Sequence, residues 1–182
     1  MLLAALLASV RVPQPRAPRG ARALMQQGQD PNELFRVYAP PQSLAAPLVG
    51  EPAILGNLKK PRALVHRDGD FHRSVHVWLV DPRRQLLLQQ RSASKDTHPC
   101  LLDVSCAGHI TGDDTVLDTA VRELYEELGV RVDAESVASA RLCTLPSVQE
   151  GHTVRHGPFI CREFQDLFLL RWPVPLVASD FT

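Results

Sequence analysis

Apolar side chains recur at helical spacing between Thr115 and Leu128, and this stretch carries the clearest periodicity in the chain. They fall at positions i, i+4, i+7 and i+11, which places them on one helix face: Leu117, Val121, Leu124 and Leu128. Asp113, Asp114 and Thr115 supply side chains suited to capping the helix start. Gly129 stands where helices often end in a left-handed residue. The pattern therefore predicts an amphipathic helix between these ends.

Short runs rich in β-branched and aromatic residues predict strands on both sides of this helix. Arg73–Val80 is followed by the turn signal Asp81-Pro82 and then by Gln85–Gln90, which together predict a hairpin. Further strands are expected at Leu102–Cys106, Arg141–Thr144 and Phe164–Arg171, and loops at Ser92–Leu102 and His152–Cys161. The mixture of strands with a long helix indicates the α/β class.

By composition, the chain divides into three segments. Residues 1–29 contain arginines and no carboxylate, and the apolar run Met1–Val10 is far too short to span a bilayer as a helix. This segment resembles an organellar transit peptide, which predicts a plastid or mitochondrial location, with the cytoplasm as the alternative. Residues 30–62 are proline-rich and are expected to be an irregular lead-in with a short edge strand near Glu33–Val37. Residues 63–182 are expected to form the functional domain.

Charge and cysteine content narrow the classes of partner. The 20 Lys and Arg residues balance the 20 Asp and Glu residues, so the net charge gives no sign of a surface for a nucleic-acid polymer. We therefore expect a small-molecule partner and no membrane span. The four cysteines contain no CxxC pair, and their spacing indicates neither a disulfide framework nor a zinc site. They are expected to be buried, reduced thiols.

The predicted helix carries three glutamates opposite its apolar face. At about 100° per residue, Glu123, Glu126 and Glu127 fall within roughly one third of the helix circumference. Like charges at these spacings repel each other, and a solvated helix face usually mixes signs to avoid this. Clustered carboxylates suit hard cations such as Mg²⁺ or Mn²⁺, which neutralise the repulsion. The pattern therefore predicts a divalent-metal site on this helix.

Gly108–Val130 resembles the signature of the Nudix hydrolase superfamily. That signature is Gly, five residues, Glu, seven residues, then Arg-Glu-aliphatic-any-Glu-Glu-any-Gly-aliphatic, and Asp114 is the one departure. The resemblance implies a metal site made by Glu123, Glu126, Glu127 and the carbonyl of Gly108, with Glu126, Glu127 and Arg122 as catalytic candidates. Arg122 would orient the carboxylates. Asp114 would brace the loop through Arg122, although its side chain is one methylene shorter than the usual glutamate.

The same resemblance implies an α/β/α sandwich with a mixed sheet flanked by helices. In the family, the strand that matches Phe164–Arg171 is normally followed by another strand and a packing helix. The sequence up to Thr182 shows neither pattern, so the domain is expected to be C-terminally incomplete. An exposed sheet face would then favour oligomerisation.

A second resemblance is to isopentenyl-diphosphate isomerases and their hydrolase-like relatives. It rests on His66–Trp78, Gln89–Ser92 and Ala107-Gly108-His109. In the isomerases, histidines at the matching positions help to bind a divalent metal, which makes three histidines here candidate metal or substrate ligands: His66, His72 and His109. Glu163 matches the second of two downstream isomerase glutamates and is a further catalytic candidate, with Asp166 as its rival.

Two departures favour a hydrolase over an isomerase. Ala107 replaces the isomerase cysteine, and Cys106, one residue earlier on a strand, would point to the opposite side. Cys161 occupies the place of the first downstream glutamate. The expected function is metal-dependent hydrolysis of a diphosphate linkage in a nucleoside-diphosphate-linked, prenyl or other diphosphate substrate. Isomerase activity and a non-catalytic diphosphate-binding module are the alternatives.

Overall fold

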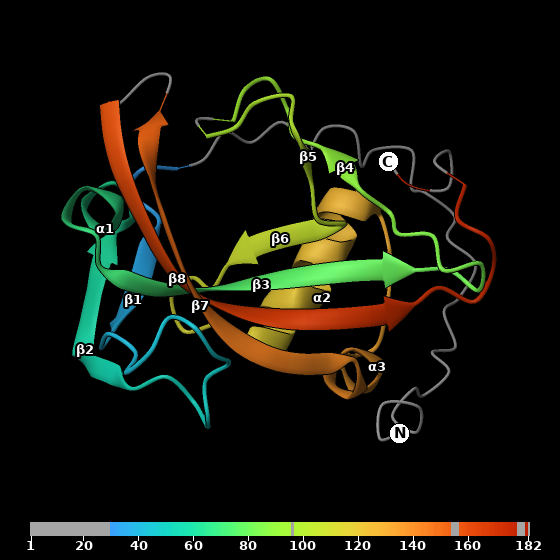
Figure 1. The fold of residues 1–182 in the computed structure, drawn as a ribbon, viewed down its shortest axis with the longest axis horizontal. Coiled ribbons are helices and arrows are strands. Elements are labelled where there is room, and N and C mark those ends of the chain that lie inside the picture. Colours follow the sequence, from blue (N-terminus) through green and yellow to red (C-terminus); the bar gives the residue numbers. More distant parts are fainter. Residues whose placement is uncertain (1–29, 96, 154–156, 178–180, 182) are drawn as a thin grey trace.

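The computed structural model describes residues 30–95, 97–153, 157–177 and 181, so the predicted transit peptide lies outside the described residues. Within them the chain forms a mixed sheet with a long helix against it (Figure 1). The strands are β1 (Leu34–Tyr38), β2 (Ile54–Pro61), β3 (Phe71–Val80), β4 (Gln89–Gln90), β5 (Leu102–Asp103), β6 (Cys106–His109), β7 (Arg141–Thr153) and β8 (Gly157–Arg171). The helices are α1 (Arg62–Asp68), α2 (Val116–Leu128) and α3 (Ala134–Ser139).

Strand β3 is the centre of the main sheet. The strand order is β2-β1-β3-β8-β7, and β6 pairs with β3 on the same edge as β1. The β3–β8 pair is parallel and the other pairs of this sheet are antiparallel. The expected α/β class with a mixed sheet is therefore confirmed.

The predicted helix forms as α2, with both ends where the sequence places them. Thr115 caps its start, because its hydroxyl accepts a hydrogen bond from the Asp118 backbone N–H and the Asp118 carboxylate accepts one from the Thr115 backbone N–H. Gly129 ends it in the left-handed conformation with φ of 68°. The apolar face of α2 packs against β3, β8 and Cys106 in one core cluster. Leu124 is fully buried there, as its place in the periodicity predicts.

Alternation along β3 assigns its side chains to two environments. Val75, Val77 and Leu79 lie in the core cluster with α2. The intervening residues point to the opposite face because successive side chains in a strand alternate: His72, Ser74 and His76. Figure 1 shows α2 on one side of the sheet and α1 at the end nearest β1 and β2.

Part of the segment expected to be irregular is regular structure. The edge strand predicted near Glu33–Val37 is present as β1. The prediction missed β2, which pairs with β1 in antiparallel register, and it missed the whole of α1, which begins at Arg62. The residues of β2 are mostly exposed, so they lack the alternation that a half-buried strand shows in sequence.

The predicted hairpin after β3 is correct only at its base. Leu86 forms an isolated bridge with Val80, but Gln89–Gln90 pairs with Leu102–Asp103 in a separate two-stranded sheet. The strand predicted over Leu102–Cys106 is divided between β5 and β6. Ser105 lies at the division, where its hydroxyl accepts from the Leu79 N–H and donates to the Leu87 carbonyl. These side-chain hydrogen bonds replace ladder bonds at that point.

The loop predicted over His152–Cys161 was wrong. Strands β7 and β8 continue through most of it as a long hairpin, with backbone pairing as far as Thr153 and Gly157. The two strands pair because the chain folds back on itself, and no local apolar pattern marks the pairing. The sequence therefore gives little sign of it.

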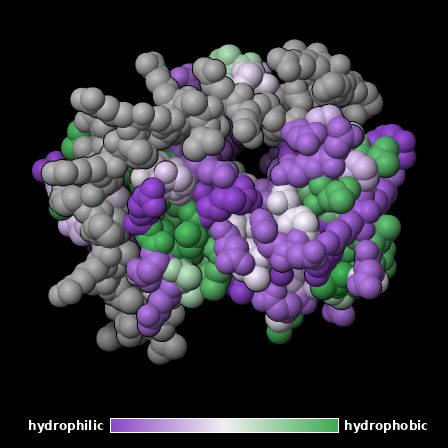
Figure 2. All heavy atoms as spheres, turned by 180° about the vertical axis from the view of Figure 1, so that it is seen from behind, coloured by the Kyte–Doolittle hydropathy of each residue, from purple (hydrophilic) through white to green (hydrophobic). Residues whose placement is uncertain are grey.

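Exposed apolar side chains are spread over several elements. Figure 2 shows patches of hydrophobic residues among hydrophilic ones on one face of the molecule. On β2, Ile54, Leu55 and Leu58 are each about half exposed. Across the described part of the chain, no helix has both the length and the apolar character that a membrane crossing requires. The expected oligomer through an exposed sheet face stays a prediction.

Candidate metal centre and active site

The three predicted carboxylates of α2 lie at its junction with β6. Glu123 is buried, whereas the side chain of Glu126 is 44% exposed. Glu127 accepts hydrogen bonds from the Ala107 N–H (3.2 Å) and from Nε2 of Gln89 (2.8 Å). The helix therefore presents three oxygen-donor side chains beside one strand, as the 3.6-residue period predicts.

Gly108 is packed against the Glu123 carboxylate. A Cβ atom at position 108 would lie 2.0 Å from Oε1 of Glu123, a distance that real Cβ atoms do not reach. The absence of a side chain thus allows α2 to approach β6 closely enough to set Glu123 against the strand. This contact lies at the glycine that begins the Nudix-like pattern.

Arg122 joins the loop before α2 to its carboxylates. Its Nη1 donates to Oε1 of Glu123 (2.9 Å) and to Oε2 of Glu126 (3.2 Å). Its Nη2 lies 3.7 Å from Oδ2 of Asp114. The shorter Asp114 side chain therefore still reaches the arginine, and the brace expected from the family pattern is present as an ion pair.

The charge balance of this group fits a hard divalent cation. Burial, together with Glu127 and Glu126, raises the pKa of Glu123 to about 7 against the opposing effect of Arg122. Arg122 and Lys95, whose Nζ lies 3.9 Å from Oε1 of Glu127, are the cations that pair with this group, and the carboxylates of Asp114 and the three glutamates outnumber them. Oxygen donors with uncompensated charge are the ligands that Mg²⁺ and Mn²⁺ prefer. The residues present fit the metal that the family resemblance implies.

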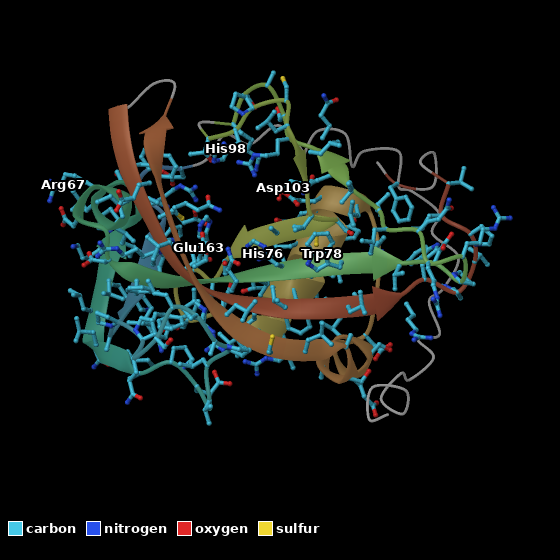
Figure 3. All side chains as sticks on the ribbon, in the orientation of Figure 1. Arg67, His76, Trp78, His98, Asp103 and Glu163 are labelled. Carbon is cyan, nitrogen blue, oxygen red and sulfur yellow. The ribbon has the colours of Figure 1, made fainter. Side chains whose placement is uncertain are left out.

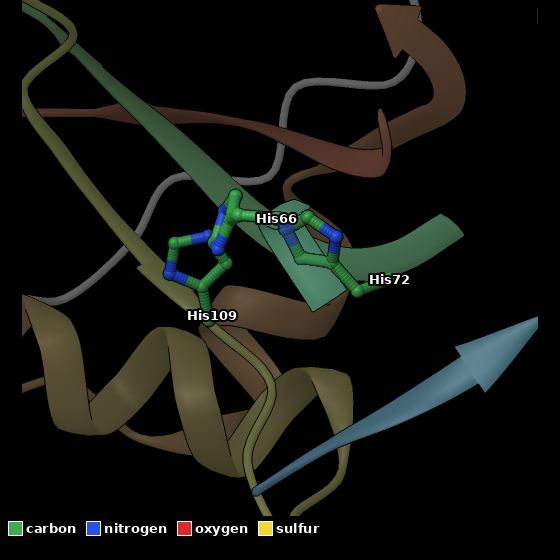
Figure 4. A group of neighbouring side chains, drawn as sticks. All are labelled: His66, His72 and His109. Atoms are coloured by element: carbon green, nitrogen blue, oxygen red, sulfur yellow. The ribbon is translucent and has the colours of Figure 1, made fainter. Parts of the chain in front are cut away.

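The three candidate histidines also come together, although they are far apart in sequence. His66 is on α1, His72 on β3 and His109 on β6, and a ring nitrogen of each lies within 4.8 Å of the others (Figure 4). Phe35 of β1 stacks on His72 and His109 and packs this cluster from one side. The structure therefore brings the three candidate residues together in one cluster, and their role as ligands stays a prediction.

Glu163 accepts hydrogen bonds from several of these side chains. His109 Nε2 lies 3.0 Å from its Oε1, and Ser74 donates to its Oε2 at 3.0 Å. Figure 3 shows Glu163 and His76 close together, on β8 and β3. Burial acts to raise the pKa of Glu163, but hydrogen bonds from His109, His72 and His76 hold it well below its usual range. Glu163 is therefore a buried anion among imidazoles.

The rival carboxylate Asp166 has a different environment. It accepts from Nε and Nη2 of Arg73 at 2.6 and 3.1 Å, and from the Thr144 hydroxyl at 2.8 Å. Arg141 also donates to it at 2.5 Å. Residues 164 and 165 separate Glu163 from Asp166. Because successive side chains of a strand point to opposite faces, the two carboxylates lie on opposite faces of β8. Asp166 is thus part of a buried ion-pair network that joins β3, β7 and β8.

Cys161 belongs to the histidine cluster, which the sequence did not indicate. Its Sγ lies 3.7 Å from Nε2 of His66 and 3.2 Å from Oε1 of Glu163. The expectation of buried thiols is correct for Cys106, but Cys161 is half-buried and Cys100 is exposed. Alternation along β8 places Cys161 and Glu163 on one face. The sequence did not indicate this, because residues up to Cys161 were expected to form a loop.

The predicted site residues thus form two groups on either side of β6. Gly108 contacts Glu123 of the α2 carboxylate group, and the next residue, His109, contacts Glu163 of the histidine group. Cys106 lies in the core with α2, and Ala107 pairs with His76 of β3. The expectation that Cys106 points away from the histidine side is confirmed.

Comparison with known proteins gives consistent matches. A family model of the NUDIX domain matches residues 70–178. The chain is 47% identical over 124 residues to Nudix hydrolase 3 of Arabidopsis thaliana, which covers 66% of this chain and 15% of that protein. It is 36% identical over 85 residues to an isopentenyl-diphosphate Delta-isomerase of Serratia proteamaculans, covering 47% of this chain and 46% of the isomerase. The matched region thus spans less than half the length of these relatives.

A solved structure of a Deinococcus radiodurans protein is also similar, at 26% identity over 60% of this chain and 61% of that chain. Its TM-score of 0.39 is too low to support a conclusion about function. The family match covers more than half of the chain and includes the glycine, arginine and glutamates whose geometry is described above. The chain therefore belongs to the Nudix family.

Proposed function

We propose that this protein is a metal-dependent hydrolase of diphosphate linkages. The observation that carries the proposal is the α2 carboxylate group, in which Glu123, Glu126 and Glu127 converge beside Gly108 with one arginine to orient them. A bound Mg²⁺ or Mn²⁺ would neutralise diphosphate charge and lower the pKa of a bound water. The family match supports the same chemistry.

The positions of the α2 side chains indicate a different role for each of them in catalysis. Glu123, Glu126, Glu127 and the Gly108 carbonyl would hold the cation. Arg122 holds the carboxylates of Glu123 and Glu126 in place through its hydrogen bonds. Glu126 is the most exposed of the three glutamates, so it is the best placed to accept a proton from water at the substrate.

The substrate is a small molecule with a diphosphate group, either nucleoside-diphosphate-linked or a prenyl or other diphosphate. The α2 residues handle the diphosphate and not the group attached to it, so they do not distinguish these classes. Turnover across nucleotide sugars, dinucleotides and prenyl diphosphates would identify the class.

Isomerase activity is the second candidate, because the histidine cluster and the isomerase similarity both favour it. The geometry of β6 opposes it. The isomerases use a thiol at the position of Ala107, and here the neighbouring thiol, Cys106, is fully buried in the core against α2. We therefore favour hydrolysis.

The test is release of phosphate or monophosphate in the presence of Mg²⁺, with Glu126→Gln as the variant. Loss of a metal-bound carboxylate or base is expected to reduce turnover by about 10²–10⁴-fold. Glu150→Gln, an exposed glutamate on β7, is the matched control and should keep wild-type rates. Equal rates in wild type and Glu126→Gln would refute the site. Proton exchange into isopentenyl diphosphate without phosphate release would favour the isomerase, and tight binding without turnover would favour the binding module.

A further inference from the structure

The hydrogen bonds described for Glu127 come from two strands outside its own helix. Its Oε2 accepts from Nε2 of Gln89 on β4 at 2.8 Å and from the backbone N–H of Ala107 on β6 at 3.2 Å. The other two glutamates of α2 instead accept from Arg122, which lies on the same helix as they do. The three carboxylates are therefore held by two separate arrangements, and Gln89 supplies the side-chain donor of the second.

The amide of Gln89 can satisfy this contact in one orientation. A carboxylate accepts hydrogen bonds, so the nitrogen of the amide, and not its oxygen, faces Glu127. An amide N–H donor carries no net charge, whereas Arg122 brings a positive charge to the other two carboxylates. Gln89 can therefore fix the orientation of the Glu127 carboxylate without neutralising it, and the negative charge stays available to a divalent cation.

The two carboxylate oxygens of Glu127 have different neighbours. Oε2 accepts both N–H bonds, whereas Oε1 lies 3.9 Å from Nζ of Lys95. Such a long ion pair with a lysine whose side chain is 31% exposed is weak, so a divalent cation can displace it. Oε1 is therefore the oxygen of Glu127 that is open to a cation.

Gln89 is itself held in place by the segment that follows it. It pairs with Asp103 in the two-stranded β4–β5 sheet. Arg91 donates to the Thr97 carbonyl from Nε and Nη2 at 3.0 and 2.9 Å, and to Asp103 from Nη1 at 2.7 Å. These bonds tie the loop after β4 to both strands, and β4 lies beside the end of α2 that carries Glu127 (Figure 1). The donor is thus presented by a supported strand and not by a free side chain.

We propose that Gln89 is a positioning residue for the carboxylate of Glu127, and that it raises the affinity of the α2 carboxylate group for Mg²⁺ or Mn²⁺. The inference rests on the proposed function, because it takes the α2 glutamates as the metal ligands. A side chain that hydrogen-bonds to a metal-binding carboxylate fixes its orientation, and loss of such a partner typically costs about 10–100-fold in metal affinity or activity.

The experiment measures Mn²⁺ binding to the full chain without substrate, from the electron paramagnetic resonance signal of free Mn²⁺. Gln89→Met removes the N–H donor, keeps an unbranched side chain and should weaken Mn²⁺ binding by about 10–100-fold. Gln90→Met is the matched control and should keep wild-type affinity, because the amide of Gln90 donates to the Cys100 carbonyl at 3.0 Å. Unchanged affinity in Gln89→Met, or an equal loss in both variants, would overturn the proposal.

A double-mutant cycle shows whether Gln89 acts through Glu127. Glu127→Gln removes the carboxylate that Gln89 positions. In that background Gln89→Met should therefore lower the remaining Mn²⁺ affinity by less than about twofold, which is within the usual error of additivity. A further loss as large as the one in the wild type would show that the two residues act independently, and the positioning role would be wrong.

Hydrolysis at varied Mg²⁺ concentration gives a second readout. The Mg²⁺ concentration for half-maximal turnover should rise by about 10–100-fold in Gln89→Met. The value of kcat at saturating Mg²⁺ should stay close to that of the wild type, because a higher metal concentration fills the weakened site. A merely structural role predicts the reverse, which is a fall in kcat that added Mg²⁺ does not restore, and that result would contradict the proposal.

The role of Gln89 and the proposed function can fail separately. Glu126→Gln should weaken Mn²⁺ binding whether or not Gln89 contributes, because it removes one of the proposed ligands. If Glu126→Gln lowers the affinity and Gln89→Met does not, the α2 site stands and only the role of Gln89 is wrong. If Glu126→Gln leaves Mn²⁺ binding unchanged, the α2 site is wrong, and the role of Gln89 is wrong with it.

Discussion

The Oε1 atom of Glu123 occupies the space in which position 108 would carry its first side-chain atom, 2.0 Å from the place of a Cβ. Gly108 and Glu123 are therefore a matched pair, because the carboxylate can reach β6 only while residue 108 has no side chain. The two residues are fifteen positions apart in the sequence and belong to different elements. The pair sets how closely α2 approaches β6, and with it the position of the metal-binding face.

Gly108→Ala is expected to displace Glu123 and to lower the free energy of unfolding by about 1–3 kcal/mol, the usual cost of overpacking. Chemical denaturation measures the change. In a Glu123→Ala background the collision is removed, so the same glycine substitution should destabilise much less. Equal losses in both backgrounds would show that the contact is not the cause.

The raised pKa of Glu123 predicts a dependence of stability on pH in the metal-free protein. The folded state holds this proton up to about pH 7, whereas the unfolded chain releases it near the ordinary value of 4.5. Stability should therefore fall as pH rises through this window, by at most about 3 kcal/mol. Urea titrations of wild type and Glu123→Gln from pH 4 to about pH 8 measure the difference.

The variant should lack this part of the decline, because glutamine does not ionise. Mg²⁺ should also reduce the decline in the wild type, since a bound cation stabilises the ionised carboxylate. If the two proteins show the same pH profile, burial does not perturb Glu123.

The Asp114–Arg122 ion pair is expected to matter for catalysis and little for stability. Both side chains are more than a third exposed, so Asp114→Ala should change the free energy of unfolding by less than about 1 kcal/mol. Loss of this ion pair should lower kcat by about tenfold, which corresponds to an increase of roughly 1.4 kcal/mol in the activation free energy. Steady-state kinetics and thermal unfolding on the same samples separate the two effects.

Asp113→Ala is the matched control for this pair, because Asp113 bonds to Arg36 and Lys59. It should keep kcat. Asp114→Glu restores the residue usual in the family and should keep or raise kcat. A tenfold loss in both alanine variants would indicate a general effect of the loop.

Asp166 is expected to act through stability. It is fully buried with two arginines, and removal of one partner from a buried ion pair costs about 3–5 kcal/mol. Asp166→Asn should therefore lower Tm by several degrees. Asp103→Asn, which breaks a partly exposed pair with Arg91, is the control and should cost less than about 1 kcal/mol. Normal stability with lost turnover in Asp166→Asn would place Asp166 in the active site.

The sequence by itself determined α2 and its chemistry. The apolar period, the cap at Thr115, the stop at Gly129 and the convergence of three glutamates are consequences of helix geometry over neighbouring residues. Local interactions decide such features, and local interactions can be read from order along the chain. The spacing of Gly108 from Arg122 likewise indicated the Nudix family, which the family match shows.

Only the tertiary structure decided which distant residues meet. The β7–β8 hairpin, the pairing of β2 and the division between β5 and β6 depend on long-range register, which has little local signature. The same register carries Cys161 and Glu163 to the histidines of α1 and β3. A cluster made from side chains on separate elements forms only after the backbone has folded, so the sequence supplies its residues and the arrangement of the sheet decides how they meet.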